Sequence, residues 1–281
     1  MPPELVVRAA GFAPVKGMRH LGLDHVRLDG QGPVGDRQWC LVDVVARRVL
    51  RTVQHPSLIG VVARIEGPVL SMTLPSGDSV AAEPVATGET LTCDYWGRSV
   101  DLALTDGPHA GLVSDHLGRD VRLAAAPRGG VVFNAPVTLV GTASIEHLAR
   151  IAAHPALVRE AGRFRATFVV ETDEPFVEDT WLGTEVAVGQ ARLRIGGPVP
   201  RCAVVDSHPV TGEKDVRLLR AMTGSRPTNA AGEPMLGMYA ACVAPGVVPV
   251  GRAAVGWATP ADREGVGQPL LTGIVQEKGV E

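Results

Sequence analysis

The chain has 281 residues, of which 45% are apolar and 20% charged, so a packed core is expected rather than disorder. The net charge of −3 and the 4% aromatic content argue against a nucleic-acid-binding protein, which needs a basic excess and stacking surfaces. No apolar run approaches the roughly 20 residues of a membrane span, no signal peptide is recognised and the four cysteines are scattered, so we expect a cytoplasmic protein.

Short apolar, β-branched segments recur along the chain between glycines, prolines and aspartates, a pattern typical of antiparallel strands. The expected strands are residues 26–28, 39–43, 59–65, 70–74, 100–104, 121–123, 137–140, 168–170, 185–188, 192–195, 203–205 and 247–250. Apolar residues at helical spacing predict helices over residues 142–154 and 216–223, with a weaker pattern over residues 108–117. The predicted fold is therefore mainly β with a few helices (α+β), of sandwich or barrel type.

A proline followed by glycines, at Pro127-Arg128-Gly129-Gly130, predicts a domain boundary. We expect an N-terminal β-barrel-like domain over residues 1–126 and a second β domain over residues 127–258. Residues 259–281 have no clear periodicity and are interpreted as a C-terminal tail.

Cys202 is the first candidate for chemistry. The adjacent Arg201 would favour a thiolate, which is both the nucleophilic and the metal-binding form of cysteine. Pro198 and Pro200 restrict the backbone before it, so the thiol is expected on an ordered loop or edge. The alternative is a buried structural cysteine, which is the commonest role of this residue type.

Basic residues at three places are candidates for binding an anion. Lys16 precedes Gly17 in a loop, where a glycine allows close backbone approach to the anion. Arg37 lies at the start of an expected strand, and an ordinary surface ion pair explains it equally well. Arg163 and Arg165 are two residues apart in what we interpret as a strand, so both would lie on one face and need an anion or a carboxylate.

Ten short motifs follow one another along the chain: residues 14–17 (PVKG), 35–39 (GDRQW), 54–56 (QHP), 96–98 (WGR), 163–165 (RFR), 178–183 (EDTWLG), 201–202 (RC), 206–212, 236–239 (LGMY) and 245–251 (PGVVPVG). In their order and spacing they resemble the MOSC superfamily, named for the C-terminal domain of molybdenum cofactor sulfurases. The resemblance covers nearly the whole chain, to about residue 255, and is strongest with two-domain members such as the amidoxime-reducing proteins.

The resemblance implies an N-terminal β-barrel-like domain packed on a MOSC β-barrel domain. It also implies a molybdenum cofactor (Mo-molybdopterin) in the cleft between them, with Cys202 as the thiolate ligand of molybdenum. Gly17 and Thr167 depart from a serine and an asparagine that are common in the family. The cofactor-binding positions that the resemblance implies are Lys16, Gly17, Arg37, Arg165, Thr167 and Arg201.

The implied function is an oxidoreductase that reduces N-hydroxylated or related N-oxygenated small molecules. Because the sequence has no four-cysteine cluster motif, electrons are expected from a separate flavin, haem or iron–sulfur protein. Two alternatives remain open. In one, Cys202 is the nucleophile or persulfide carrier of a sulfur-transfer or C–S-cleaving protein; in the other, the chain is a non-catalytic cofactor carrier. Nucleic acid and membrane partners are not expected.

Overall fold

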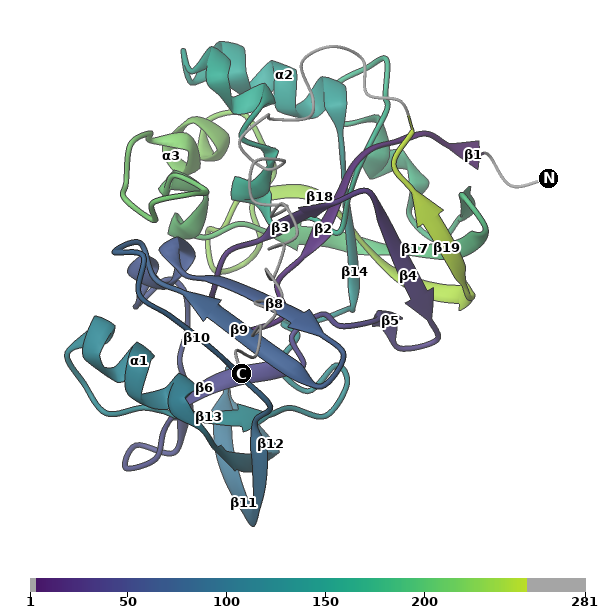
Figure 1. The fold of residues 1–281 in the computed structure, drawn as a ribbon. Coiled ribbons are helices and arrows are strands. Elements are labelled where there is room, and N and C mark those ends of the chain that lie inside the picture. Colours follow the sequence, from purple (N-terminus) through teal and green to yellow (C-terminus); the bar gives the residue numbers. More distant parts are fainter. Residues whose placement is uncertain (1–3, 252–281) are drawn as a thin grey trace, which may run out of the picture.

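The computed structural model describes residues 4–251 (Figure 1). In chain order the elements are β1 (Glu4–Leu5), β2 (Val7–Phe12), β3 (Leu21–Leu23), β4 (His25–Asp29), β5 (Gly32–Pro33), β6 (Trp39–Asp43), β7 (Arg48–Val49), η1 (Pro56–Gly60), β8 (Val62–Glu66), β9 (Val69–Thr73), β10 (Ser79–Ala82), β11 (Val85–Tyr95), β12 (Arg98–Asp106), α1 (Pro108–Leu117), β13 (Arg122–Ala125), β14 (Val137–Gly141), α2 (Thr142–Ile151), η2 (Pro155–Val158), η3 (Ala161–Phe164), β15 (Phe168–Val170), η4 (Val177–Trp181), β16 (Glu185–Val188), β17 (Ala191–Pro200), η5 (Ala203–Asp206), α3 (Leu218–Thr223), β18 (Met235–Ala244) and β19 (Gly246–Pro249). The mainly β, α+β fold predicted from the sequence is confirmed.

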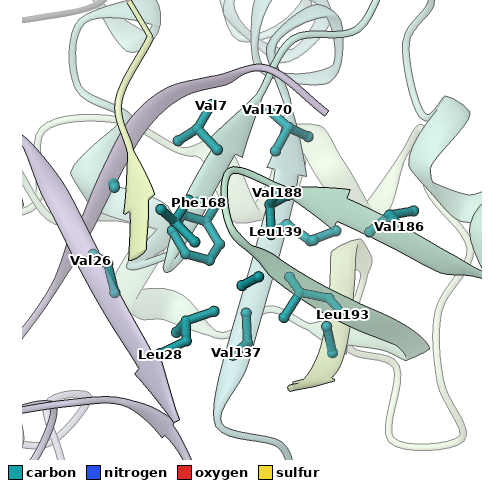
Figure 2. Close-up of a cluster of buried hydrophobic side chains, with 14 of the residues drawn as sticks. Val7, Val26, Leu28, Val137, Leu139, Phe168, Val170, Val186, Val188 and Leu193 are labelled. Atoms are coloured by element: carbon teal, nitrogen blue, oxygen red, sulfur yellow. The ribbon is translucent and has the colours of Figure 1, made fainter. Parts of the chain in front are cut away.

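The largest sheet has eight strands in the order β1-β16-β17-β18-β14-β15-β2-β3. Strands β1 and β16 are parallel, as are β14 and β15, while the other neighbours in this sheet are antiparallel. Its main core is a cluster of buried aliphatic side chains around Phe168, which Figure 2 shows between the strands. Three strands of this sheet come from the first 23 residues of the chain.

The remaining strands form a closed barrel and two small sheets. The barrel has the order β11-β12-β13-β6-β7, and its interior holds Tyr95 and Leu102. A three-stranded sheet, β10-β9-β8, lies beside the barrel and contacts α1 (Figure 1). A second small sheet, β19-β4-β5, joins the start of the chain to its last described strand.

The first 33 residues pair with strands from the second half of the chain. Strand β2 pairs with β15, and β4 pairs with β19. The boundary after residue 126 stays a prediction, and the predicted tail at residues 259–281 lies outside the described residues. Within residues 4–251, none of the helices has the length and apolar character needed to cross a membrane.

Two expected strands were wrong. Residues 203–205 lie in the 3-10 helix η5, in which the Val205 amide donates to the Cys202 carbonyl at 3.2 Å. An apolar run of three residues is compatible with a strand and with a helical turn alike. In η5 only Val205 of the three is buried. Arg163 lies in the 3-10 helix η3, and Arg165 follows it in the left-handed conformation, with φ of 50°. The two arginines therefore do not share a strand face.

Candidate functional site

A cavity of about 190 Å³ is lined by residues from both halves of the chain. Its wall includes Lys16 and Arg37 from the first half, and Arg165, Arg201 and Cys202 from the second. Five of the seven sequence-predicted site positions thus meet at one place. Gly17 and Thr167 do not line this cavity.

Lys16 is held by a short turn against the barrel. Its amide donates to the Trp39 carbonyl at 2.8 Å, and the buried side chains of Val15 and Met18 fix the turn on either side. Gly17 has φ of 93°, a conformation that side chains rarely adopt, so its position shapes the turn rather than the cavity wall. The Lys16 Nζ atom lies 5.6 Å from the centroid of the Tyr95 ring.

Arg37 is anchored by its neighbour Asp36. The Arg37 Nε atom donates to Asp36 Oδ2 at 2.6 Å, while Asp36 Oδ1 accepts from the Ala13 amide at 3.3 Å. Burial alone would lower the pKa of Arg37, but the Asp36 carboxylate raises it above the usual value. Arg37 therefore contributes a permanent charge whose position is fixed.

Arg165 lies between η3 and β15. Within residues 4–251, neither the Arg165 side chain nor the Lys16 ammonium group forms a hydrogen bond or an ion pair. Burial, and then repulsion from Arg37, lowers the pKa of Arg165 to about 10. Two half-buried cations without an acceptor in the wall of one cavity are the arrangement expected for an anion site.

The three cations create a strong positive field. Burial, followed by the charges of Arg37 and Arg165, lowers the pKa of Lys16 to about 7. Burial and the same two arginines lower the pKa of the nearby His20 to about 3. An anion in the cavity would reverse the electrostatic part of both shifts, since it favours the charged form of each base.

The Arg201 side chain connects two backbone segments next to the site by hydrogen bonds. Its Nε atom donates to the Leu236 carbonyl of β18 at 2.9 Å, and its Nη1 atom donates to the Phe164 carbonyl at 2.7 Å. The Arg201 side chain thus ties the segment that presents Arg165 to β18. Its third nitrogen, Nη2, is buried and has no hydrogen-bond partner among the described residues.

Cys202 is the half-buried residue that precedes η5, and it lines the cavity. The other three cysteines, Cys40, Cys93 and Cys242, do not line it. Burial raises the pKa of each of these three thiols, which keeps them protonated. Cys202 is therefore the cysteine of this sequence that can meet a bound molecule in the cavity.

Two residues singled out in the sequence have structural contacts that explain them. Arg163 pairs with Glu160 and with Asp215, whose Oδ2 atom lies 2.7 Å from Arg163 Nη2. Thr167 exchanges two hydrogen bonds of 3.1 Å with Thr138, which lines the cavity. Thr167 thus supports the cavity wall from behind.

Sequence reasoning missed two tyrosines in the cavity wall. Tyr95 is 1% exposed, its hydroxyl has no hydrogen-bond partner among the described residues, and burial raises its pKa to about 12. Tyr239 is also buried, and its pKa is raised because of that burial. The only sequence signal for their orientation is the alternation of side chains between the two faces of a strand. Each adds a neutral donor to the cationic wall.

Comparisons with known proteins agree with this architecture. The family model described as the MOSC domain matches residues 113–255, and the one described as the MOSC N-terminal beta barrel domain matches residues 7–120. A protein from Caenorhabditis elegans named molybdenum cofactor sulfurase is 29% identical over 230 residues, which is 76% of this chain and 30% of that protein. A protein of the same name from Drosophila mojavensis is 25% identical over 68% of this chain and 26% of its own length.

The chain thus spans less than a third of the length of these two relatives. Among solved structures, the YUAD protein from Bacillus subtilis is similar over 88% of this chain and 92% of its own, with 12% identity and a TM-score of 0.41. YiiM from Geobacillus stearothermophilus is similar over 46% of this chain and 60% of its own, with 16% identity and a TM-score of 0.29.

Proposed function

The chain belongs to the MOSC family and is related to molybdenum cofactor proteins, and from this premise we propose that it is a molybdenum-cofactor-dependent reductase of N-hydroxylated small molecules. The proposal rests on one observation. A half-buried thiol and two cations without acceptors among the described residues line the same cavity.

The donor set fits a molybdopterin cofactor. Lys16, Arg37 and Arg165 would hold its phosphate group, and the Tyr95 hydroxyl, which has no partner in residues 4–251, offers a further hydrogen-bond donor. Thiolate is a soft ligand of the kind that molybdenum takes, so Cys202 would bind the metal. When bound, the cofactor supplies the two-electron redox chemistry that none of these side chains can supply alone.

Reduction of an N-hydroxylated compound consumes two electrons and two protons and gives the amine or amidine and water. The residues of the chain would bind and orient the cofactor and the substrate. With the phosphate bound, its charge favours the ammonium form of Lys16, so Lys16 would act as a positioning cation. We propose that the electrons come from a separate protein with a flavin, haem or iron–sulfur group, because the four cysteines of this sequence form no cluster motif.

Metal and pterin analysis tests this function. The chain is expressed in a host that makes the cofactor, and molybdenum and pterin fluorescence are measured on the wild type, Cys202→Ala and the control Cys242→Ala. We expect molybdenum and pterin in the wild type and the control, with molybdenum lost from Cys202→Ala. A wild type that carries neither would overturn the proposal, as would retention of molybdenum by Cys202→Ala.

A second candidate function is sulfur transfer, which the names of the two relatives favour. In this case the Cys202 thiolate would attack the outer sulfur of a donor persulfide. A new S–S bond forms on Cys202, and the donor leaves as its thiolate. Intact mass after incubation with a cysteine desulfurase and cysteine would then show one added sulfur atom, absent in Cys202→Ser. An unchanged mass in the wild type contradicts this second function.

A further inference from the structure

Three exposed apolar side chains gather on the cavity wall. Val53 is 40% exposed, Trp96 42% and Phe133 43%, and all three line the cavity that holds Cys202. We call these three side chains the aromatic rim, after the two aromatic rings among them. Large apolar groups that stay exposed at the edge of a cavity typically mark a binding surface. The cavity therefore has a cationic part, formed by Lys16, Arg37 and Arg165, and an apolar part.

Trp96 occupies a turn position that its own conformational preference does not favour. It connects β11 to β12 with Gly97, and the flanking residues Tyr95 and Arg98 pair directly, so the hairpin has a two-residue turn. Trp96 has φ of 56° and Gly97 has φ of 77°, as in a type I′ turn, where Asn-Gly is the usual sequence. The left-handed region is disfavoured for a bulky residue, because its Cβ atom comes too close to the following carbonyl oxygen. Such strain is common at functional sites.

The two rings are held in a fixed arrangement. The Arg51 guanidinium carbon lies 4.6 Å from the Trp96 ring centroid, and Arg51 Nε donates to Gln54 Oε1 at 3.1 Å. The Trp96 and Phe133 rings lie 5.3 Å apart with an interplanar angle of 85°. Together they form a right-angled corner, in which a flat ring can stack on one face and meet the edge of the other.

We propose that the aromatic rim binds a planar aromatic or heteroaromatic ring of the substrate. This inference rests on the proposed function. The pterin of the cofactor is also planar, but we assign the rim to the substrate because the rim side chains are 40–43% exposed, whereas the cationic residues that would hold the cofactor are more buried. A ring bound at the rim leaves the N-hydroxy end of the substrate free to reach the inner part of the same cavity.

Two amidoximes that differ only in the ring test the proposal. Binding of benzamidoxime and of acetamidoxime is measured by isothermal titration calorimetry on protein purified from the cofactor-producing host, without an electron donor, so no turnover occurs. The wild type should bind benzamidoxime about tenfold more tightly than acetamidoxime, since aromatic pairs and buried apolar area favour the ring. Trp96→Asn and Phe133→Ala should each remove most of this preference and leave acetamidoxime binding unchanged.

Trp96→Asn keeps the hairpin, because Asn-Gly is the preferred type I′ turn, and we expect it to fold at least as well as the wild type. Leu182→Ala, which removes an exposed apolar side chain outside the cavity, is the matched control and should change neither affinity. An unchanged benzamidoxime affinity in Trp96→Asn overturns the proposal. An equal loss for both amidoximes, or a loss of pterin from Trp96→Asn, also overturns it. A wild type without molybdenum overturns the proposed function, whereas the two affinities still decide the role of the rim.

Discussion

At the scale of single residues, Lys16 is expected to couple anion binding to pH. Its pKa of about 7 is low because burial, Arg37 and Arg165 all disfavour the ammonium form. An anion in the cavity favours that form, so binding takes up a proton above about pH 7. We expect the affinity for sulfate, which does not titrate in this range, to fall as the pH rises from about 6 to about 9. Calorimetry in buffers of different ionisation enthalpy measures both the affinity and the proton uptake.

Lys16→Met tests the effect of the same residue on the stability of the fold. The folded pKa of about 7 lies below the unfolded value of 10.5, so the folded chain binds fewer protons between these values. The stability of the wild type should therefore rise with pH across this window. Below about pH 7 the full destabilisation caused by the half-buried, charged Lys16 side chain is present. At pH 6 we expect Lys16→Met to raise the Tm by about 2–4 °C while it weakens sulfate binding. The control is Lys214→Met, because Lys214 is exposed. Equal changes in Tm and in sulfate affinity for the two variants would contradict the lowered pKa of Lys16.

At the scale of elements, Gly237 allows β18 to pass close to the site. It has φ of 70°, and a Cβ atom there would lie 2.4 Å from the Leu139 carbonyl oxygen and 3.3 Å from Arg201 Nη2. Gly237→Ala should therefore lower the free energy of unfolding by about 2 kcal/mol or more, through backbone strain and the clash with β14. Urea denaturation measures this change.

Gly183→Ala separates strain from clash. Gly183 also has positive φ, of 78°, but a Cβ atom added there would meet no atom of the described residues within 4 Å beyond its chain neighbours. Its substitution should cost only the strain, about 1 kcal/mol. Equal losses in Gly183→Ala and Gly237→Ala would show that the close packing of β18 against β14 and Arg201 contributes nothing.

The same strand shows why the sequence predicts some elements and misses others. Strands such as β15 and β16 are short β-branched runs between turn residues, and their bounds were predicted correctly. Strand β18 was missed, because its first residues are buried on both faces and show no alternation of apolar and polar residues. The conformation of Arg165 has no local signal either, since an arginine rarely adopts positive φ. The order of the motifs predicted that Arg165 belongs to the site. Its backbone conformation depends on tertiary contacts.

At the scale of the whole molecule, the cavity exists only because distant segments meet. Lys16 comes from a turn near the start of the chain, Tyr95 from the barrel hairpin and Cys202 from the segment before η5. Motifs could predict the candidates for ligand binding one at a time. The proximity of Tyr95 and of the aromatic rim to Cys202 could not be predicted, because it depends on how the barrel and the large sheet pack together.

The pairing of the first strands predicts how the chain can be divided. The core around Phe168 includes Val7, Ala10, Val26 and Leu28, and each large aliphatic side chain of this kind contributes about 1.5–3 kcal/mol when buried (Figure 2). A fragment of residues 127–258 lacks these side chains and leaves β15 without its partner β2. We therefore expect no cooperative thermal unfolding from it by near-ultraviolet circular dichroism. Residues 1–33 joined by a flexible linker to residues 127–258 restore every strand of the large sheet, so this chain should unfold cooperatively. Cooperative unfolding of the shorter fragment alone would show that the predicted boundary after residue 126 delimits an independent domain.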